Sequence, residues 1–256
     1  MAKRSTRRAH RRINETVQYA GDNNVRRLFD EQQWSPIDEP AKDEKFRDHK
    51  YRKNIRAQNE SQQKMLDAID VAPLVFAVGS AGTGKTYLAV AKAVEALESG
   101  AVRRIVLSRP AVEAGESLGF LPGDMEEKLS PYLRPLYDAL IDRLSTKRLK
   151  ALMAEGVIEI APIAYMRGRT LNNAYVVIDE AQNCTYGQLK MLLTRLGWNS
   201  SMVVTGDPAQ NDLLPGMSGL MDVAEKLESL KNVEVVHFSR EDVVRHPLVA
   251  DMIDRL

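Results

Sequence analysis

A glycine-rich octapeptide carries the clearest chemistry in the sequence: Gly79-Ser80-Ala81-Gly82-Thr83-Gly84-Lys85-Thr86. It fits the phosphate-binding pattern G-x-x-x-x-G-K-[ST] at every fixed position. Its glycines leave room for backbone N–H groups to turn toward phosphate oxygens. Lys85 would reach the β- and γ-phosphates, and the hydroxyl of Thr86 would bind Mg²⁺. The pattern predicts a site for a nucleoside triphosphate and Mg²⁺ at these eight residues.

A pair of acids follows an apolar stretch much later in the chain. Residues 175–178 read Tyr-Val-Val-Ile, and Asp179 and Glu180 come directly after them. Sheet topology can bring this later strand beside the strand that precedes the glycine-rich loop. Asp179 would then hold Mg²⁺, and Glu180 would orient and deprotonate a water molecule. The glutamate therefore favours hydrolysis over binding alone. The sequence contains no N-K-x-D stretch, so specificity for GTP is not indicated.

A third apolar run, residues 202–205, leads into a polar turn that contains Gln210. A turn at the end of a buried strand is well placed to sense the γ-phosphate. An ordinary strand and turn fits the same residues equally well.

The segments between these motifs alternate between apolar runs and stretches with helical spacing. Runs such as Val176-Val177-Ile178 lack polar alternation, which is typical of strands buried on both faces. The runs cover residues 74–78, 104–107, 157–161, 175–178, 202–205 and 233–238. Apolar residues three and four apart favour helices over 61–69, 86–97, 125–144, 188–196 and 220–230. This alternation predicts one open, mainly parallel α/β sheet flanked by helices, in a domain over residues 58–256.

The beginning of the chain differs in charge from the rest. Residues 1–60 carry 15 Lys and Arg against 10 Asp and Glu, although the whole chain has a net charge of only +1. A basic block repels itself and also suits a phosphate backbone. We expect residues 1–57 to form a basic, largely irregular tail or linker with one short helix near residues 25–33. The tail is either a solvated terminus or an arm that binds nucleic acid.

The composition excludes several classes of protein. Hydrophobic residues make up 44% and charged residues 28%, as in globular domains. No apolar run is long enough for a membrane span, and the first residues lack the apolar core of a secretory signal. The single cysteine, Cys184, excludes a disulfide framework and is expected to pack as a small apolar residue. We therefore expect a cytoplasmic protein with no membrane partner.

Long stretches outside the generic motifs resemble the PhoH family. The matching segments are 107–116, 118–124, 131–136, 165–170, 179–183 and 242–247. The resemblance implies a domain similar to the first RecA-like lobe of superfamily-one helicases. It also implies binding and hydrolysis of ATP with Mg²⁺, assembly into hexameric rings, and a link to RNA with helicase activity.

The same resemblance implies roles for several amides. Gln182 and Gln210 match helicase positions that touch the γ-phosphate or couple it to the nucleic acid. Asn59 and Gln62 stand about where related enzymes place a glutamine that reads adenine. A solvated helix face is an equally good interpretation of Asn59 and Gln62.

The predicted sheet leaves room for only one RecA-like lobe. Superfamily-one helicases bind ATP between two lobes, and an arginine supplied to the transition state is worth roughly 10³–10⁵ in rate. We expect a neighbouring copy to supply it, in a cyclic homo-oligomer for which the resemblance implies six copies. Arg245 is the first candidate for this catalytic arginine and Arg240 the second. A surface salt bridge is the alternative for each.

Candidate contacts to a single strand of RNA or DNA lie on two predicted turns. Arg167 and Arg169 flank Gly168, and two arginines on a glycine hinge can grip phosphates. Ser108 and Arg109 follow a predicted strand, where related motors contact the nucleic-acid backbone. Ion pairing between subunits is the alternative for Arg167 and Arg169.

Together the motifs predict an ATPase coupled to single-stranded RNA or DNA, as a ring-forming motor or helicase. The alternative is a nucleotide-dependent assembly or scaffold protein that acts on a protein partner. Stimulation of turnover by a polynucleotide would separate the two.

Overall fold

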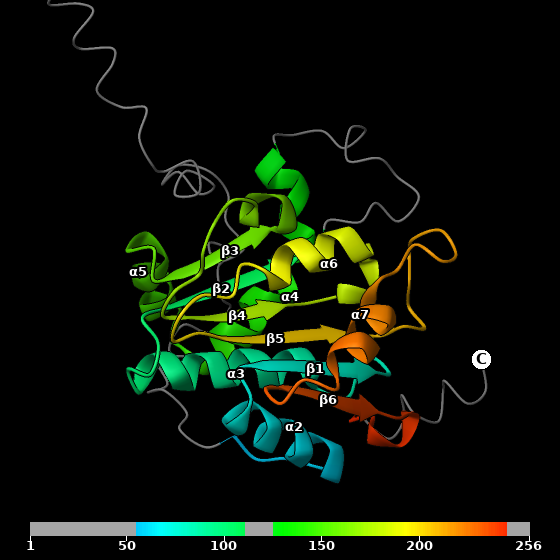
Figure 1. The fold of residues 1–256 in the computed structure, drawn as a ribbon. Coiled ribbons are helices and arrows are strands. Elements are labelled where there is room, and N and C mark those ends of the chain that lie inside the picture. Colours follow the sequence, from blue (N-terminus) through cyan, green and yellow to red (C-terminus); the bar gives the residue numbers. More distant parts are fainter. Residues whose placement is uncertain (1–54, 111–124, 245–256) are drawn as a thin grey trace, which may run out of the picture. The chain divides into compact units, whose positions relative to one another are not determined.

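The computed structural model describes residues 55–110 and 125–244, and its strands form one six-stranded sheet (Figure 1). The strands are β1 (Leu74–Gly79), β2 (Arg104–Arg109), β3 (Ile158–Pro162), β4 (Ala174–Ile178), β5 (Ser201–Gly206) and β6 (Val233–Phe238). Their order across the sheet is β3-β2-β4-β5-β1-β6, and every neighbouring pair is parallel. All the carboxyl ends therefore meet at one edge.

The apolar runs explain why the central strands lie in the interior. Every residue of β4 is buried, and β1 is buried up to Val78. The edge strand β6 instead contains both buried and exposed residues: Glu234 and His237 are exposed, whereas Val233, Val236 and Phe238 are buried. Strands without polar alternation need cover on both faces, which the helices provide.

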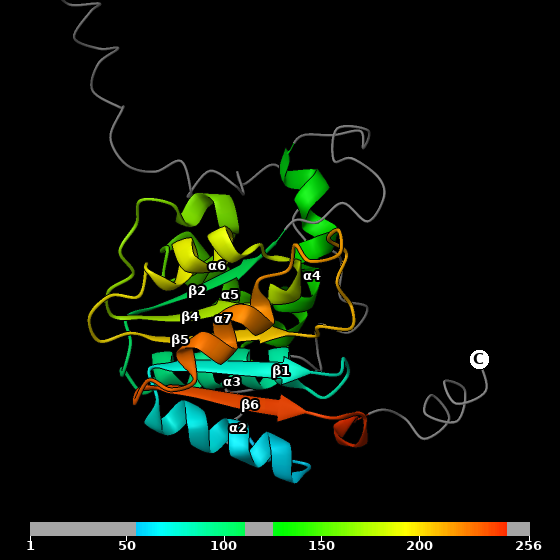
Figure 2. The ribbon, with the colours of Figure 1, turned by 45° about the vertical axis from the view of Figure 1, so that its right-hand side comes forward.

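Helices cover both faces of the sheet, as Figures 1 and 2 show. One face is covered by α3 (Lys85–Glu98), and α4 (Met125–Arg143) packs on α3 and β2. At the sides, α2 (Glu60–Val71) packs on β6, β1 and α3, and α5 (Thr146–Ala154) packs on β3. The other face is covered by α6 (Tyr186–Leu193) and α7 (Leu220–Leu227). Leu189 and Val223 from these two helices pack with Phe76 and Val204 of the sheet in one buried cluster.

The predicted sheet, with its parallel strands and flanking helices, is confirmed. The helix α5 was not predicted, and the expected helix near residues 25–33 lies outside the described residues. One detail of strand order differs from the expectation. The acidic strand β4 does not lie beside β1, because β5 is inserted between them. The strand order thus places two polar strand ends, not one, next to the glycine-rich loop.

Within the two stretches that the structure describes, no helix combines the length and apolar character that a membrane crossing requires.

Candidate nucleotide site

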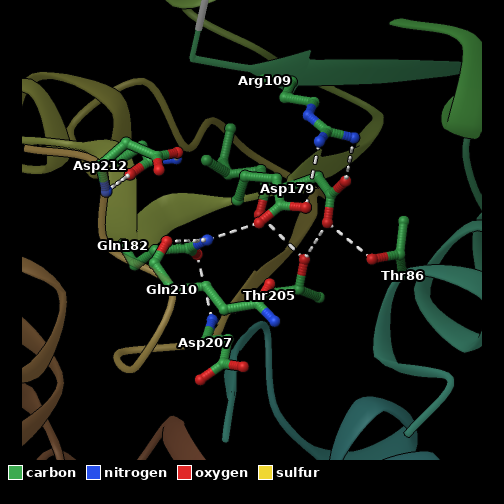
Figure 3. A network of polar contacts seen from close by, with 11 residues as sticks. Thr86, Arg109, Asp179, Gln182, Thr205, Asp207, Gln210 and Asp212 are labelled. Atoms are coloured by element: carbon green, nitrogen blue, oxygen red, sulfur yellow. Dashed lines mark hydrogen bonds and ion pairs between the residues drawn. The ribbon is translucent and has the colours of Figure 1, made fainter. Parts of the chain in front are cut away.

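The candidate site lies at the edge of the sheet where the carboxyl ends of the parallel strands meet (Figure 3). The glycine-rich loop leaves β1 there, a polar residue ends β2, and polar residues directly follow β4 and β5. These elements and one side of α4 line a pocket of about 530 Å³. Pockets for small molecules usually fall between about 300 and 1,000 Å³. The pocket is large enough for a nucleotide and lies at the position typical of open α/β sheets.

The shape of the loop depends on glycine at two places in particular. Gly79 has a φ of +135°, and a Cβ atom there would lie 1.9 Å from the carbonyl oxygen of Phe238 on β6. Gly84, with a φ of +85°, is the residue from which α3 starts. A side chain at Gly79 would push the loop off β6, so glycine is required for the close approach.

The amino end of α2 supports the loop from the side. Asn59 caps α2 by accepting a hydrogen bond from the backbone N–H of Gln62 at 2.8 Å. Gln62 is buried, and its Nε2 donates to the carbonyl oxygen of Thr83 at 2.9 Å. Its Oε1 accepts from the N–H of Gln58 at 2.8 Å. Gln62 therefore braces the loop, and its predicted contact with adenine stays a prediction that would need an exchange of these partners.

Residues after β6 form a second support. The N–H of Val244 donates to the carbonyl oxygen of Gly82 at 3.0 Å. The side chain of Asn59 donates to the carbonyl oxygen of Asp242 at 3.0 Å, which ties this segment to α2. The loop is thus held between α2 and residues 242–244.

Lys85 is folded over the loop with its ammonium group surrounded by oxygen. Its Nζ donates to the carbonyl oxygens of Gly79 at 2.7 Å and Ser80 at 2.6 Å, and lies 3.2 Å from Oγ1 of Thr83. Burial lowers the pKa of Lys85 below its usual value, and the negative charges nearby, that of Asp207 first, oppose this shift. The ammonium group has only neutral acceptors bound directly, so phosphate oxygens would be better partners.

Asp179, directly after β4, connects the end of the glycine-rich loop to β5. Its Oδ1 accepts from Oγ1 of Thr86 at 2.6 Å and from Oγ1 of Thr205, on β5, at 2.7 Å. Thr86 and Asp179 are 93 residues apart in the sequence. A hydroxyl and a carboxylate side by side are oxygen ligands of the kind that Mg²⁺ prefers. The residues present thus fit a magnesium ion at Thr86 and Asp179, and binding of the ion there stays a prediction.

Glu180 occupies an unusual backbone conformation. Its φ of +53° lies in the left-handed region, which costs free energy for any residue except glycine. Both carboxylate oxygens have donors: Nη2 of Arg109 lies 3.1 Å from Oε1, and Nε2 of Gln182 donates to Oε2. Glu180 lines the pocket beside Lys85 and Thr86, where a general base for water would be required.

Gln182 links the acidic pair to the turn after β5. Its Oε1 accepts from the N–H of Asp207 at 3.0 Å, and its Nε2 also lies 3.3 Å from the carbonyl oxygen of Gln210 (Figure 3). Asp207 in turn accepts from the N–H of Ala81, in the glycine-rich loop, at 2.8 Å. The network connects the loop, β4 and β5, and Gln210 lines the pocket as expected.

Sequence reasoning missed Thr205 and Asp207 as members of the site. Both are buried, and both bond to residues that the motifs identified, Asp179 and Ala81. Their signal was present, because a polar pair at the end of an apolar run repeats the pattern of Asp179 and Glu180.

One side of α4 was also missed. Asp138 and Asp142, four residues apart on the helix, line the pocket, and Oδ2 of Asp142 accepts from the hydroxyl of Tyr87 at 2.7 Å. Tyr87 directly follows Thr86, so the first turn of α3 is held against α4 next to the loop.

The predicted nucleic-acid contacts do not gather on one surface. Ser108 is fully buried, and its hydroxyl has no hydrogen-bond partner among the described residues. Arg109 points into the pocket toward Asp179 and Glu180. Their contact with a nucleic-acid strand stays a prediction that would require a rearrangement.

The Arg167–Arg169 turn contains one paired and one exposed arginine. Arg169 makes a bidentate ion pair with Glu159 on β3, at 2.5 and 2.7 Å, and this pairing raises the pKa of Arg169. Arg167 is exposed. The ion-pair alternative is therefore realised for Arg169, within the chain rather than between subunits. Arg240 is exposed in a short 3₁₀ helix, and Arg245 lies outside the described residues.

The family model and two curated relatives that match this chain belong to one family. Residues 54–256 match the family model described as PhoH-like protein. The chain is 56% identical over 203 residues to a PhoH-like protein of Bacillus subtilis, covering 79% of this chain and 64% of the relative. It is 49% identical over 205 residues to Protein PhoH of Escherichia coli K12, covering 79% and 58%. The chain thus spans about three-fifths of the length of these curated relatives.

Solved structures with a similar fold are remote in sequence. The large terminase from a thermophilic bacteriophage is 14% identical with a TM-score of 0.48, covering 77% of this chain and 49% of that one. Pif1 helicase from Candida albicans is 14% identical with a TM-score of 0.36, covering 78% and 43%.

Proposed function

Because this chain belongs to the PhoH family, we propose that it binds ATP with Mg²⁺ at the carboxyl edge of its sheet and hydrolyses it. We propose further that hydrolysis is coupled to single-stranded RNA or DNA in a ring of identical subunits. The chain is an enzyme, a P-loop ATPase, in this proposal.

The contact between Thr86 and Asp179 carries the proposal. A hydroxyl at the end of the glycine-rich loop meets a carboxylate 93 residues later, at 2.6 Å. In P-loop enzymes this pair of groups holds the magnesium ion of the nucleotide. Bound there, Mg²⁺ would neutralise phosphate charge and so favour attack on the γ-phosphorus.

The residues of the site have distinct tasks in hydrolysis. Lys85 would exchange the carbonyl oxygens of Gly79 and Ser80 for oxygens of the β- and γ-phosphates. The loop and the start of α3 would offer backbone N–H groups to the phosphates. Glu180 would accept a proton from the attacking water, and Gln182 holds Glu180 in place from the turn after β4. Gln210, beside them, would orient the water or the γ-phosphate.

A ring is the simplest way to complete the site. The side chain of Glu180 is 31% exposed in the pocket, and phosphoryl transfer gains from an arginine placed there. We propose that a neighbouring copy supplies Arg245, with Arg240 as second candidate. Mixed assemblies of Arg245→Ala and Lys85→Ala subunits test this, because interfaces that are intact on both sides should recover some turnover. No recovery would count against an arginine acting between copies.

Turnover of ATP, with and without Mg²⁺ and with and without single-stranded RNA, tests the proposed activity. Lys85→Ala should abolish turnover, whereas Lys92→Ala, two turns further along α3 and paired with Asp70, should retain it. Absence of turnover in the unaltered chain would contradict the proposal. Turnover that no polynucleotide stimulates would instead favour the scaffold that acts on a protein partner. Molecular mass in solution tests the ring.

A further inference from the structure

Arg109 is the one arginine at the described carboxyl edge whose guanidinium faces the two catalytic acids together (Figure 3). It is the last residue of β2, the strand next to β4. Nη2 lies 3.1 Å from Oε1 of Glu180, and Nη1 lies 3.5 Å from Oδ2 of Asp179. The side chain of Arg109 is 18% exposed and that of Asp179 only 4%. Glu180, the closer of the two partners, is 31% exposed, so the ion pair is only partly shielded from water.

The two carboxylates need a positive charge next to them. Asp179 and Glu180 are adjacent in sequence and face the same pocket, so two negative charges would repel each other there without a partner. The hydroxyls of Thr86 and Thr205 bond to Asp179 but carry no charge. Lys85 bonds directly only to loop oxygens. Among the residues that the structure describes, Arg109 is therefore the cation that forms ion pairs with both acids.

Arg109 and the proposed nucleotide site use the same oxygens. Magnesium at Thr86 and Asp179 would bring two positive charges close to the guanidinium, which repel it. Glu180 would also have to turn its carboxylate toward water, and Oε1 is at present bonded to Arg109. Arg109 and the magnesium-bound nucleotide would thus compete for the carboxylates of Asp179 and Glu180.

We propose that Arg109 is a displaceable counter-ion of the acidic pair. It neutralises Asp179 and Glu180 while the site lacks a nucleotide, and it leaves them when magnesium and nucleotide bind. Arg109 is in this role a positioning residue, which holds Oε1 of Glu180 in an ion pair until the site is loaded. The inference rests on the proposed function, since it names a regulation of that same site.

If Arg109 and the ligand compete for the acidic pair, removing Arg109 should change the affinity for the ligand in a direction that can be measured. An interaction present in the empty site and lost in the loaded one lowers the affinity for the ligand that displaces it. Removing the charge of Arg109 should therefore increase the gain in ADP affinity that Mg²⁺ brings. A residue that merely supports the fold, or that binds phosphate, would not produce this increase.

The first experiment measures binding of ADP to the full chain, with Mg²⁺ and with EDTA, for the unaltered protein and Arg109→Gln. We expect the strengthening of ADP binding by Mg²⁺ to be about threefold larger in Arg109→Gln, the size of a partly exposed ion pair. Arg104→Gln is the matched control, because Arg104 starts the same strand, donates to the carbonyl oxygen of Thr170 at 3.5 Å and does not line the pocket. An equal or smaller strengthening in Arg109→Gln would overturn the inference.

A second experiment needs no nucleotide. The midpoint of thermal unfolding is measured for Arg109→Gln, Glu180→Gln and the double variant. We expect the two substitutions to be coupled, so that the double variant loses less than the two single losses together. Additive losses would mean that the pair does not exist in the empty protein, and would sink the idea.

The two proposals fail in different ways. A chain that binds ADP with Mg²⁺ and shows the coupling, but never hydrolyses ATP, contradicts the proposed activity and supports Arg109 as counter-ion. A chain that hydrolyses ATP but shows additive losses contradicts only the role of Arg109.

Discussion

The candidate nucleotide site and the Arg167–Arg169 turn were both predicted from short motifs, but they differ in how many of the predicted residues the fold brings into contact. At the site, Thr86, Asp179 and Glu180 come together with partners for each polar group. At the turn, Arg169 is taken up by Glu159, and only Arg167 is exposed. A motif with fixed spacing along one loop specifies geometry, whereas arginines chosen by type alone are open to capture by any nearby acid.

The largest expected effect is a loss of ATP hydrolysis when one carboxylate of the candidate site is changed. The matched substitution changes a carboxylate beside the Arg167–Arg169 turn. Glu180→Gln removes the proposed base, so we expect kcat for ATP hydrolysis to fall about 10²- to 10⁴-fold while ATP still binds. Glu159→Gln changes the acid that pairs with Arg169, outside the pocket, and should leave kcat within about twofold. Steady-state kinetics of both variants provide the measurement. Similar losses in the two variants would erase the distinction between the regions.

Two glycines sharpen the comparison at the level of the backbone. Gly79→Ala places a Cβ 1.9 Å from the carbonyl oxygen of Phe238, and should destabilise the fold by more than about 3 kcal/mol. Gly168 has a φ of +77° with no atom within 4 Å of an added Cβ, so Gly168→Ala should cost only about 1–2 kcal/mol of backbone strain. Urea unfolding gives both values. Equal costs would show that the close approach to β6 is not what requires glycine.

Sequence could predict every strand of the sheet, and the inner strands most clearly, because strands buried on both faces are continuous apolar runs such as 74–78 and 175–178. It could not predict the order of those strands. Nothing in residues 202–205 indicates that β5 separates β4 from β1, since strand order is decided by how the helices pack. The helix α5 was missed because only Leu149 and Leu152 of its nine residues are buried apolar side chains, too few for a clear period.

For the site, sequence predicted the residues of local motifs and missed those that depend on distant partners. The octapeptide specifies a loop that its own glycines can form, so Lys85 and Thr86 could be assigned roles directly. The predicted nucleic-acid contact of Arg109 stays a prediction, but its ion pairs with the two acids were missed, because the sequence does not reveal that β2 and β4 are neighbours. That neighbour relation is what turns Arg109 toward Asp179 and Glu180.

The Arg167–Arg169 turn can be tested as a nucleic-acid contact of the remaining exposed arginine. Arg167→Ala should weaken binding of single-stranded RNA and reduce the slope of log affinity against log salt by about one. Glu159→Gln should strengthen binding modestly, because it frees Arg169. Fluorescence anisotropy over a salt series measures both changes. If neither variant alters RNA binding, the turn is not part of the interface.

The smallest effect concerns Cys184, which directly follows Asn183 at the back of the site. It is fully buried, as its expected apolar packing requires, and burial raises the pKa of the Cys184 thiol from its usual 9.0 to about 12. Since the thiolate is the reactive form, alkylation by iodoacetamide at about pH 8–9 should be far slower in the native protein than in denaturant. Mass spectrometry over time measures the rate.

The raised pKa of Cys184 also makes the stability of the fold depend on pH. Between pH 9 and pH 12 the unfolded chain loses the thiol proton of Cys184 while the native chain keeps it. Stability should therefore fall slightly as pH rises through this range, and Cys184→Ala should remove that part of the decline. Rapid alkylation of the native protein would mean that the region behind Gln182 and Asn183 opens readily. In that case local opening would be frequent at the candidate site, and the contrast between the candidate site and the Arg167–Arg169 turn would be lost.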